Sequence, residues 1–419
     1  MATGPRQRIV IGADTYPPDV NGAANFAHRL ADGLARRGHD VHVVAPHPGA
    51  GPERVTAGGV TVHRLRSHRT PFHPTFRVCL PPQIRGSAAR LLDRIAPDAV
   101  HVQSHFAVGR TLVGAARRRG VPVVATNHFM PENLIGYAPL PDRFAAAACK
   151  PAWRDLVRVF RHAQVVTAPT PRAARLLPEH GLGRTPLAVS CGLDLDRFAQ
   201  PAAERTDERL RVLFVGRLDA EKNVQDILRA LPRLPAGLPV TAEIVGDGSR
   251  RGELEDLARA LGVADRVTFH GLVADQEVLD AYARCDVFCM PGTAELQSLV
   301  TMEAMAAGKP VVAADAMALP HLVHPGRNGL LYPPGDIPAL AAALASVLGD
   351  AGMRTRMGEA ARGIVARHDI GHTLDTFETL YREAAEAARR LPKPRDRREP
   401  RDRRVRGSES PEYAAHSGR

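Results

Sequence analysis

The fold of this chain is constrained most by an alternation of short β-branched runs with longer amphipathic runs, which begins near the N-terminus and restarts after Arg209. In the first half, the strand-like runs are 8–14, 40–46, 60–66, 98–103, 121–127 and 163–169, and the helix-like stretches are 22–37, 83–95, 108–119 and 141–161. In the second half, the strand-like runs are 210–216, 240–246, 265–271, 286–292 and 309–315, again separated by helix-like stretches. Repeated alternation of this kind predicts parallel sheets with helices on both faces.

The length of 419 residues is too great for one ordinary hydrophobic core. We therefore predict an α/β protein with two Rossmann-like domains that face a cleft. The expected domains are 1–195 and 196–370, joined by a polar linker at 194–209. A helix at 371–390 is expected to cross back to the first domain. The tail at 391–419 is basic and has almost no aliphatic residue, so it is predicted to be disordered.

The composition, with 44% hydrophobic and 24% charged residues, is typical of a soluble globular protein. No run approaches the ~18 apolar residues that a membrane span requires, and the N-terminus passes directly into a strand-like run, so we expect a cytoplasmic protein. The five cysteines contain no Cys-x2-Cys pair, which predicts reduced, buried thiols rather than disulfides or a zinc site.

The formal net charge of +11 raises the question of a nucleic-acid partner. Only four of the 56 basic residues are lysines, which indicates a general preference for arginine, and no aromatic-rich RNA-binding motif or zinc-finger spacing accompanies the charge. Nucleic acid is therefore not an expected partner. An anionic membrane surface remains open as one.

The segment 294–315, AELQSLVTMEAMAAGKPVVAAD, carries the clearest chemical pattern. Glu295 and Glu303 are eight residues apart, a little over two helical turns, so both carboxylates could face one cleft. The structural alternative is a pair of exposed glutamates on a surface helix.

A second pattern, LRVLFVGRLDAEKN at 210–223, predicts a strand that ends at Gly216, a loop with Arg217 and Lys222, and a helix. A diphosphate needs cations and backbone N–H groups at a helix start, and this loop supplies both. The alternative is two surface charges on an ordinary strand–helix turn.

Other candidates lie at the ends of predicted strands or at the start of a helix. Gly246 permits a tight turn after a strand, and Gly22 a close approach at the start of a helix. His128 follows a strand end, where ligands bind in open α/β sheets. His101 ends the previous strand run and is the better candidate for a structural histidine.

Together, the Gly-Arg-x4-Lys and Glu-x7-Glu patterns resemble those of retaining glycosyltransferases of family 4, which have the GT-B fold, and the resemblance extends over about residues 8–388. It implies a UDP- or GDP-sugar donor, no cofactor and no catalytic metal, since no Asp-x-Asp motif accompanies the site. A front-face mechanism would retain the anomeric configuration. The catalytic residues that it implies are Arg217, Lys222, Glu295 and His128.

The resemblance also implies particular donor contacts. Glu295 would bind sugar hydroxyls and Glu303 the ribose hydroxyls. The further donor-binding residues that it implies are Gly22, Gly216, Gly246, Leu272, Gln297, Ser298 and Leu299. The N–H groups of 297–299 would face the phosphates, and the backbone near Leu272 would face the nucleobase. Many relatives carry Phe-Gly at 297–298 and Gly-Gly at 22–23, so this chain departs from both patterns.

The segment 141–162 combines apolar and basic residues in a helical pattern, although Pro151 is expected to break or kink the helix. A basic helix with an aromatic face could lie on an anionic membrane, and the alternative is a domain helix with arginines on its solvent face. The chain looks closest to diacylglycerol and phosphatidylinositol glycosyltransferases, which implies a lipid acceptor and a peripheral location at the inner face of the plasma membrane.

The competing interpretations of the chain's function are an NDP-sugar epimerase of similar fold and a non-catalytic nucleotide- or nucleic-acid-binding protein.

Overall fold

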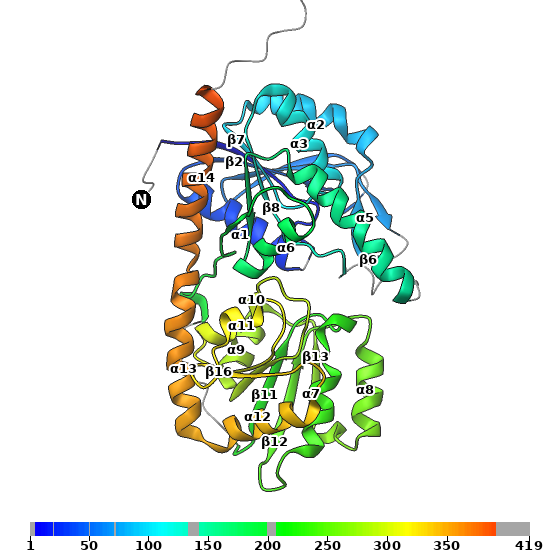
Figure 1. Ribbon diagram of the computed structural model, residues 1–419, viewed down its shortest axis with the longest axis vertical. Helices are drawn as coiled ribbons and strands as arrows, with labels where there is room; N and C mark the ends of the chain where they lie inside the picture. Colours follow the sequence, from blue (N-terminus) through cyan, green and yellow to red (C-terminus); the bar gives the residue numbers. More distant parts are fainter. Residues whose placement is uncertain are drawn as a thin grey trace, which may run out of the picture.

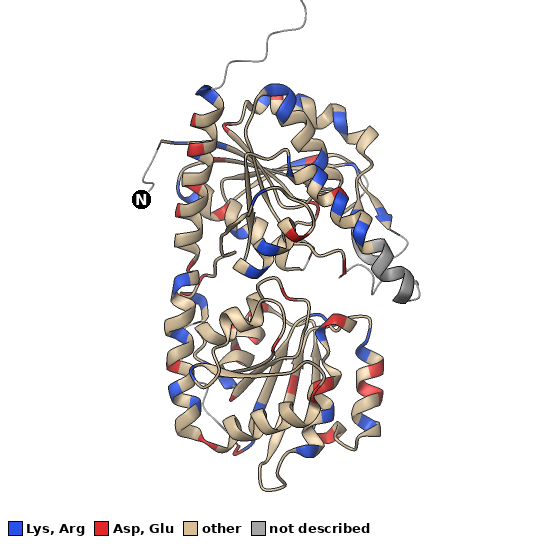
Figure 2. Ribbon diagram, viewed as in Figure 1, with Lys and Arg blue, Asp and Glu red and all other residues tan. Residues whose placement is uncertain are grey.

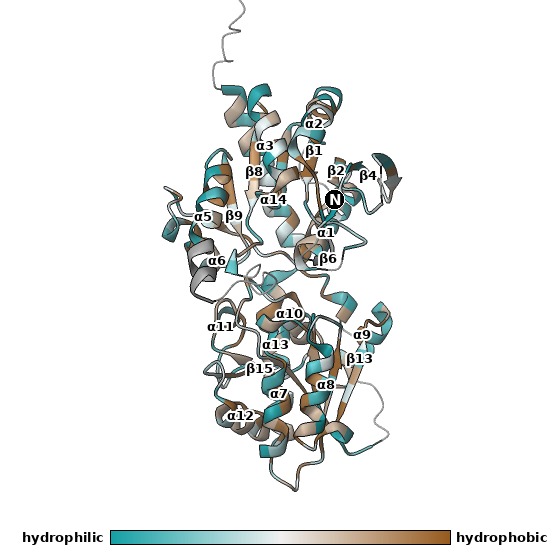
Figure 3. Cartoon of the chain, turned by 90° about the vertical axis from the view of Figure 1, so that its right-hand side faces the viewer, coloured by the Kyte–Doolittle hydropathy of each residue, from teal (hydrophilic) through white to brown (hydrophobic). Residues whose placement is uncertain are grey.

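The protein forms two α/β units stacked along its long axis (Figure 1). The computed structural model describes residues 5–19, 21–49, 51–70, 73–132, 142–198 and 207–390. Each unit is built on its own sheet of mainly parallel strands, with helices on both faces. In Figure 3 the strands are mostly brown and lie inside, whereas the surrounding helices carry teal outer faces. The predicted fold class, two Rossmann-like α/β domains, is confirmed.

The first sheet has the strand order β10-β9-β8-β7-β1-β2-β4-β3, and its neighbouring strands are parallel except for the β3–β4 pair. Its strands are β1 (Arg8–Gly12), β2 (Asp40–Pro46), β3 (Glu53–Ala57), β4 (Val60–Leu65), β7 (Ala99–Val102), β8 (Val123–Thr126), β9 (Val165–Ala168) and β10 (Leu187–Ala188). The helices around it are α1 (Gly22–Arg36), α2 (Pro81–Ile95), α3 (Ala107–Arg119), α5 (Asp142–Phe160) and α6 (Pro171–Glu179). A separate hairpin pairs β5 (His68–Thr70) with β6 (His73–Val78).

The second sheet is wholly parallel, with the strand order β13-β12-β11-β14-β15-β16. Its strands are β11 (Leu210–Val215), β12 (Val240–Val245), β13 (Val267–Gly271), β14 (Val287–Met290), β15 (Val311–Ala314) and β16 (Gly329–Tyr332). Its helices are α7 (Gln225–Ala230), α8 (Arg251–Ala260), α9 (Asp275–Arg284), α10 (Leu299–Ala306), α11 (Leu319–Leu322), α12 (Ile337–Gly349) and α13 (Ala351–Val365). The described chain also contains 3-10 turns at Asp196–Phe198, Ala220–Lys222, Leu231–Arg233, Ala264–Arg266 and Ala366–His368.

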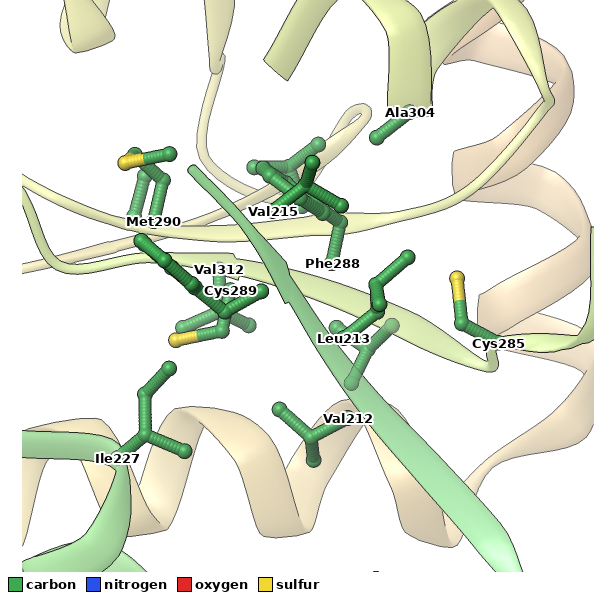
Figure 4. Packing of buried hydrophobic residues seen from close by; sticks show 14 of the residues in the cluster. Val212, Leu213, Val215, Ile227, Cys285, Phe288, Cys289, Met290, Ala304 and Val312 are labelled. Carbon is green, nitrogen blue, oxygen red and sulfur yellow. The ribbon is translucent and has the colours of Figure 1, made fainter. Parts of the chain in front are cut away.

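The core of the second domain is filled from both faces of its sheet. Figure 4 shows Ile227 from α7 and Ala304 from α10 on opposite sides of the strands, with Phe288 and Val312 between them. All five cysteines are buried, as the sequence predicted for small core residues, and their reduced state stays a prediction.

The last helix, α14 (Ile370–Arg390), runs back along the first domain (Figure 1). Its Tyr381 hydroxyl lies 2.7 Å from Nδ1 of His101, and Glu378 Oε1 lies 3.1 Å from Nε2 of His39. The predicted crossing helix is therefore confirmed. The predicted boundary at 195/196 lies between the last strand of the first sheet and the first strand of the second, and it stays a prediction. The predicted disordered tail, 391–419, lies outside the described residues.

The helix α5 differs from the sequence expectation in two respects. It continues through Pro151, so of the expected break or kink the break is not present. Its aromatic face does not reach the surface: Trp153 is 2% exposed, and Leu156, Val157 and Phe160 are packed in the core of the first domain. Of the two interpretations left open for this helix, the structure supports the domain helix with arginines on its solvent face, because its apolar residues cover the sheet.

Within the described ranges, we find no single helix that is both long enough and apolar enough to cross a membrane. The segments Ile337–Gly349 and Ala351–His368 meet the length and composition criteria only when taken together, and they are bent by 99° at their junction.

Candidate active site

The loop that follows β11 holds two cations at the carboxyl end of the second sheet. Arg217 lies beside two carboxylates, with Nη1 2.5 Å from Oδ2 of Asp219 and Nη2 2.9 Å from Oε1 of Glu221. Lys222 ends the short 3-10 turn Ala220–Lys222. The ends of parallel strands are open to ligands, so these cations are placed where an anionic group could reach them.

Lys222 joins this loop to the Glu-x7-Glu segment. Its ammonium donates a hydrogen bond to Glu295 Oε1, and the two side chains are 18% and 12% exposed. A second contact supports the same approach, since the Thr293 N–H donates to the Glu221 carbonyl at 3.1 Å. The two patterns that the sequence analysis singled out therefore form one site, although 73 residues separate Lys222 from Glu295.

Glu303 lies within α10 and accepts a hydrogen bond of 2.9 Å from the Tyr282 hydroxyl of α9. Burial raises the pKa of this carboxyl, while the charge of Arg29 and the Tyr282 hydrogen bond lower it. Our argument from helical spacing was wrong in one respect: α10 begins only at Leu299, so Glu295 lies in the preceding loop. The loop, not the helix, places the first carboxylate.

The residues between the two glutamates contact the first domain. The Gln297 side chain accepts a hydrogen bond from the Cys191 N–H at 2.9 Å and donates one to Ser190 Oγ at 2.7 Å. The hydroxyl of Thr170 donates to the carbonyl of Leu296 at 2.9 Å. This segment is thus bonded to the first domain by three hydrogen bonds, and the predicted contact of its N–H groups with the donor phosphates stays a prediction.

Ser298 and Leu299 lie where the chain enters α10. Ser298 has φ 63° and ψ 79°, a left-handed conformation that glycine adopts at lower cost. Leu299 packs against the start of α1, where its Cδ1 would lie 3.9 Å from a Cβ on Gly22. The first turns of α1 and α10 therefore meet across the domain boundary.

Gly216 and Gly246 allow the loops after β11 and β12 to touch. Gly246 has φ 127°, and a Cβ there would lie 2.0 Å from the carbonyl oxygen of Gly216. No side chain fits between the two backbones. The sequence analysis identified both positions, and the structure shows the contact that requires glycine at 246.

Leu272 lies at the far edge of the sheet, just after β13, and its side chain is 77% exposed. Beside it is a cavity of about 340 Å³, to whose lining Val245, His270 and Val273 contribute. An apolar side chain so exposed makes no specific contact in the described protein, so any role of this position in binding a base stays a prediction.

His128 is half-buried among residues of the first domain. Its Nε2 lies 2.8 Å from Gln103 Oε1, its Nδ1 lies 3.9 Å from the Cys191 sulfur, and its ring lies 4.8 Å from the Phe26 ring. Burial lowers its pKa to about 3, so the imidazole is neutral at physiological pH. Its ring therefore packs between α1 and the segment around Cys191, and its predicted contact with a sugar stays a prediction.

The structure thus joins Lys222 to Glu295 on the second domain, with Arg217 in the same loop as Lys222. Gln297 and Leu299 link the Glu295 segment to the first domain. Glu303 lies further along, within α10, where it contacts Tyr282. Sequence reasoning did not identify Tyr282, Arg29 or Ser190, which contact or act on these residues. None of these three belongs to a local pattern, because each acts on a residue far away in the chain. Among the residues described, no group of three His, Cys, Asp or Glu side chains is placed to hold a metal ion.

Comparison with known proteins agrees with this geometry. Residues 20–197 match the family model described as Glycosyltransferase Family 4, and residues 196–364 match that of Glycosyl transferases group 1. The GDP-mannose-dependent alpha-mannosyltransferase of Mycolicibacterium smegmatis is 34% identical over 86% of this chain and 93% of its own length. The chain belongs to glycosyltransferase family 4.

As a family 4 glycosyltransferase, the protein is a nucleotide-sugar-dependent hexosyltransferase. This assignment favours the first of our three interpretations over an epimerase or a non-catalytic binding protein. The alpha-monoglucosyldiacylglycerol synthase of Streptococcus pneumoniae is 26% identical over 78% of this chain and 76% of its own length.

Solved structures show the same GT-B fold. Sucrose-phosphate synthase from Thermosynechococcus elongatus superposes with a TM-score of 0.76 at 22% identity, covering 91% of this chain and all (100%) of that one. Alr3699/HepE of Anabaena, solved in complex with UDP-glucose, superposes with a TM-score of 0.71 at 22% identity, covering 90% and 99%. The predicted GT-B fold is therefore confirmed.

Proposed function

We propose that the protein transfers a hexose from a GDP- or UDP-sugar to a membrane lipid, with retention of configuration and without a metal ion. The observation that carries the proposal is the Lys222–Glu295 ion pair, which joins the cationic loop to the Glu-x7-Glu segment. GDP-mannose is the first donor to test, because the relative at 34% identity is named for its dependence on it.

The site can stabilise a departing diphosphate through its own charges. Arg217 and Lys222 are held in place by carboxylates in the unliganded protein, so little side-chain ordering is needed when phosphate arrives. Cations fixed where negative charge develops lower the barrier more than mobile ones. Once Lys222 contacts the diphosphate, Glu295 becomes available to the sugar hydroxyls. A separate metal ion is then not required to neutralise the leaving group.

Calorimetric titration with GDP-mannose and UDP-glucose in the presence of EDTA tests this proposal. We expect one of the two nucleotide classes to bind, and turnover to fall roughly a hundredfold or more in Lys222→Gln, the size seen when one transition-state contact is removed. Arg229→Gln, at an exposed position of α7, is the matched control and should keep wild-type turnover. Loss of binding in EDTA, or equal activity of the Lys222 variant, would refute the assignment.

The lipid acceptor is supported by the charge on α5 rather than by an apolar face. Its exposed basic residues are four apart, which places them on one side of the helix, and these residues are Lys150, Arg154 and Arg158. Arg161, also exposed, follows directly after the helix, and Figure 2 shows the blue basic segments along α5. Such a row attracts anionic headgroups, with about 1 kcal/mol per cation near the surface. The name of the streptococcal relative, a diacylglycerol glucosyltransferase, points to the same acceptor class. We propose a peripheral location at the cytoplasmic face of the membrane.

Flotation with vesicles separates the contribution of the basic residues of α5 to membrane binding from that of net charge. Arg154→Glu/Arg158→Glu should weaken binding to phosphatidylglycerol-containing vesicles by about tenfold or more. The control Arg229→Glu/Arg233→Glu, at exposed positions of the second domain, makes the same change of net charge and should bind as the wild type does. Equal loss in both variants would show that net charge, not the α5 row, governs the binding.

A further inference from the structure

Ser190 joins three parts of the chain that lie far apart in the sequence. Its hydroxyl oxygen lies 2.7 Å from Gln297 Nε2 and 2.9 Å from His368 Nδ1, and its carbonyl accepts a hydrogen bond of 3.0 Å from the Thr373 hydroxyl. Ser190 follows the last strand of the first sheet, Gln297 lies in the loop before α10, and His368 ends the turn that leads from α13 into α14 (Figure 1). The site described above gives no role to His368.

The two segments that connect the domains are bonded to each other at the same place. The Leu193 N–H donates to the His368 carbonyl at 2.9 Å, and the Ile370 N–H donates to the Leu193 carbonyl at 3.0 Å. Gly192 has φ 68°, and a Cβ there would lie 2.9 Å from Cα of Ile370, so the two backbones pack closely. The backbone therefore holds Ser190 and His368 side by side.

The hydrogen bonds of Ser190 determine the direction of its hydroxyl hydrogen. Gln297 Oε1 accepts the Cys191 N–H, so the Gln297 side-chain nitrogen is a donor to Ser190 Oγ. The Gly192 N–H also donates to Oγ, at 3.2 Å. A serine hydroxyl has two acceptor lone pairs and one hydrogen, so both lone pairs are in use. The hydrogen therefore points to His368 Nδ1, and His368 carries its own proton on Nε2.

His368 has no other hydrogen bond among the residues that the structure describes. Its Nε2 is buried and unpartnered there, and the ring of His321 lies 6.0 Å away between centroids at an angle of 80°. Burial lowers the pKa of His368 to about 4, with smaller effects of His321 and Arg367, so the imidazole is neutral at physiological pH. A neutral ring with its proton on Nε2 can accept the Ser190 hydroxyl hydrogen at Nδ1.

We infer that His368 is a positioning residue of the donor site, which acts through Ser190 on Gln297. Gln297 in turn holds the loop that carries Glu295. By taking the hydroxyl hydrogen, His368 leaves both lone pairs of Ser190 to the Gln297 amide and the Gly192 N–H. Without that acceptor, the buried hydroxyl turns toward another partner and the bond to Gln297 weakens. The inference rests on the proposed function only for the role of Glu295 in sugar binding.

Two substitutions of similar size separate the acceptor from the bulk of the ring. Asparagine places an oxygen near the position of Nδ1, whereas leucine has a similar shape without an acceptor. In stopped-flow measurements with whichever of GDP and UDP the wild type binds, we expect His368→Leu to raise the association rate about three- to tenfold, the factor that corresponds to one hydrogen bond on an opening step. His368→Asn should stay within about twofold of the wild type. His372→Leu, at an exposed position of α14, is the matched control and should keep the wild-type rate.

A double-variant cycle tests the dependence on Gln297. In the Gln297→Leu background, His368→Leu should change the association rate by less than about twofold, because the bond that it controls is already absent. Ser190→Ala removes the same link from its centre and should raise the rate by a factor similar to that of His368→Leu. Melting temperatures of the wild type, the two single variants and the double variant test the coupling without nucleotide: the loss in the double variant should be smaller than the sum of the two single losses.

Three results would overturn the inference: an unchanged rate in His368→Leu, an equal rise in His368→Asn, or the full effect of His368→Leu in the Gln297→Leu background. An equal rise in His368→Asn would show that the packing of the ring, and not its acceptor, governs the loop. If the wild type binds neither nucleotide, the proposed function fails. Additive melting temperatures would refute the coupling of His368 to Gln297 independently.

Discussion

Replacement of Gln297 tests most directly whether the loop before α10, which contains Glu295 and Gln297, is held by the first domain. The side chain is 4% exposed and makes two hydrogen bonds, from the Cys191 N–H at 2.9 Å and to Ser190 Oγ at 2.7 Å. In Gln297→Leu, which has a similar volume, the buried N–H of Cys191 loses its partner, at a cost of about 1–3 kcal/mol. Ser190 Oγ keeps its contact with His368 Nδ1 at 2.9 Å, so it adds little to the loss.

We therefore expect Gln297→Leu to lower the free energy of unfolding by about 2 kcal/mol, with an unchanged denaturant slope. Urea titration followed by circular dichroism measures this change. Gln276→Leu makes the same substitution at an exposed position of α9 and should stay within about 0.5 kcal/mol of the wild type. If the two variants have equal stability, the hydrogen bonds of Gln297 do not hold the loop, and the reasoning from its buried amide is wrong.

Two further predictions concern the contacting loops and the buried histidine. Gly246→Ala places a Cβ 2.0 Å from the Gly216 carbonyl oxygen and should abolish nucleotide binding in calorimetry, whereas Gly252→Ala, in open space on α8, should stabilise the fold by about 0.5–1 kcal/mol. Burial lowers the pKa of His128 to about 3, below its unfolded value of about 6.5, so the unfolded state binds the extra proton and stability falls as pH drops through 6.5. His128→Gln should therefore remove about 2 kcal/mol of the stability lost between pH 7.5 and pH 5, and urea titrations at the two pH values that show an unchanged loss would contradict this.

The fold was predictable because its central strands are buried on both faces and are rich in valine, as β8 and β15 are. The strands that the sequence analysis missed, among them β3 and β16, do not show this buried, valine-rich pattern. Every residue of β3 is exposed, so the strand shows no apolar alternation. The four-residue strand β16 lies at the sheet edge and follows a turn, and it carries too few residues to show a period.

The site residues that could be predicted from the sequence are those in local patterns, and those that were missed act through contacts between distant residues. Glu295, Glu303, Arg217 and Lys222 belong to local patterns whose chemistry can be interpreted from neighbouring residues. The Tyr282 hydroxyl was not identified, because its partner Glu303 is 21 residues away and a tyrosine within a helix is more often part of the core. Contacts of this kind depend on how helices pack, which a single sequence does not specify.

The Gln-Ser pair at 297–298, which replaces the Phe-Gly of many relatives, changes how the cleft can open. Ser298 bears the cost of a left-handed backbone, roughly 1–2 kcal/mol, which glycine would avoid. In return, Gln297 provides two cross-domain hydrogen bonds, and a third runs from Thr170 to the Leu296 carbonyl. At about 1 kcal/mol each, breaking the three costs about 3 kcal/mol, so an open form would be populated at less than roughly one molecule in a hundred unless its freed groups gain new partners. Donor entry would then be limited by opening of this loop, and Gln297→Leu should raise the association rate of the nucleotide as well as lower stability. Stopped-flow measurement of that rate separates the two effects: an unchanged rate would mean that the donor enters without the loop leaving the first domain.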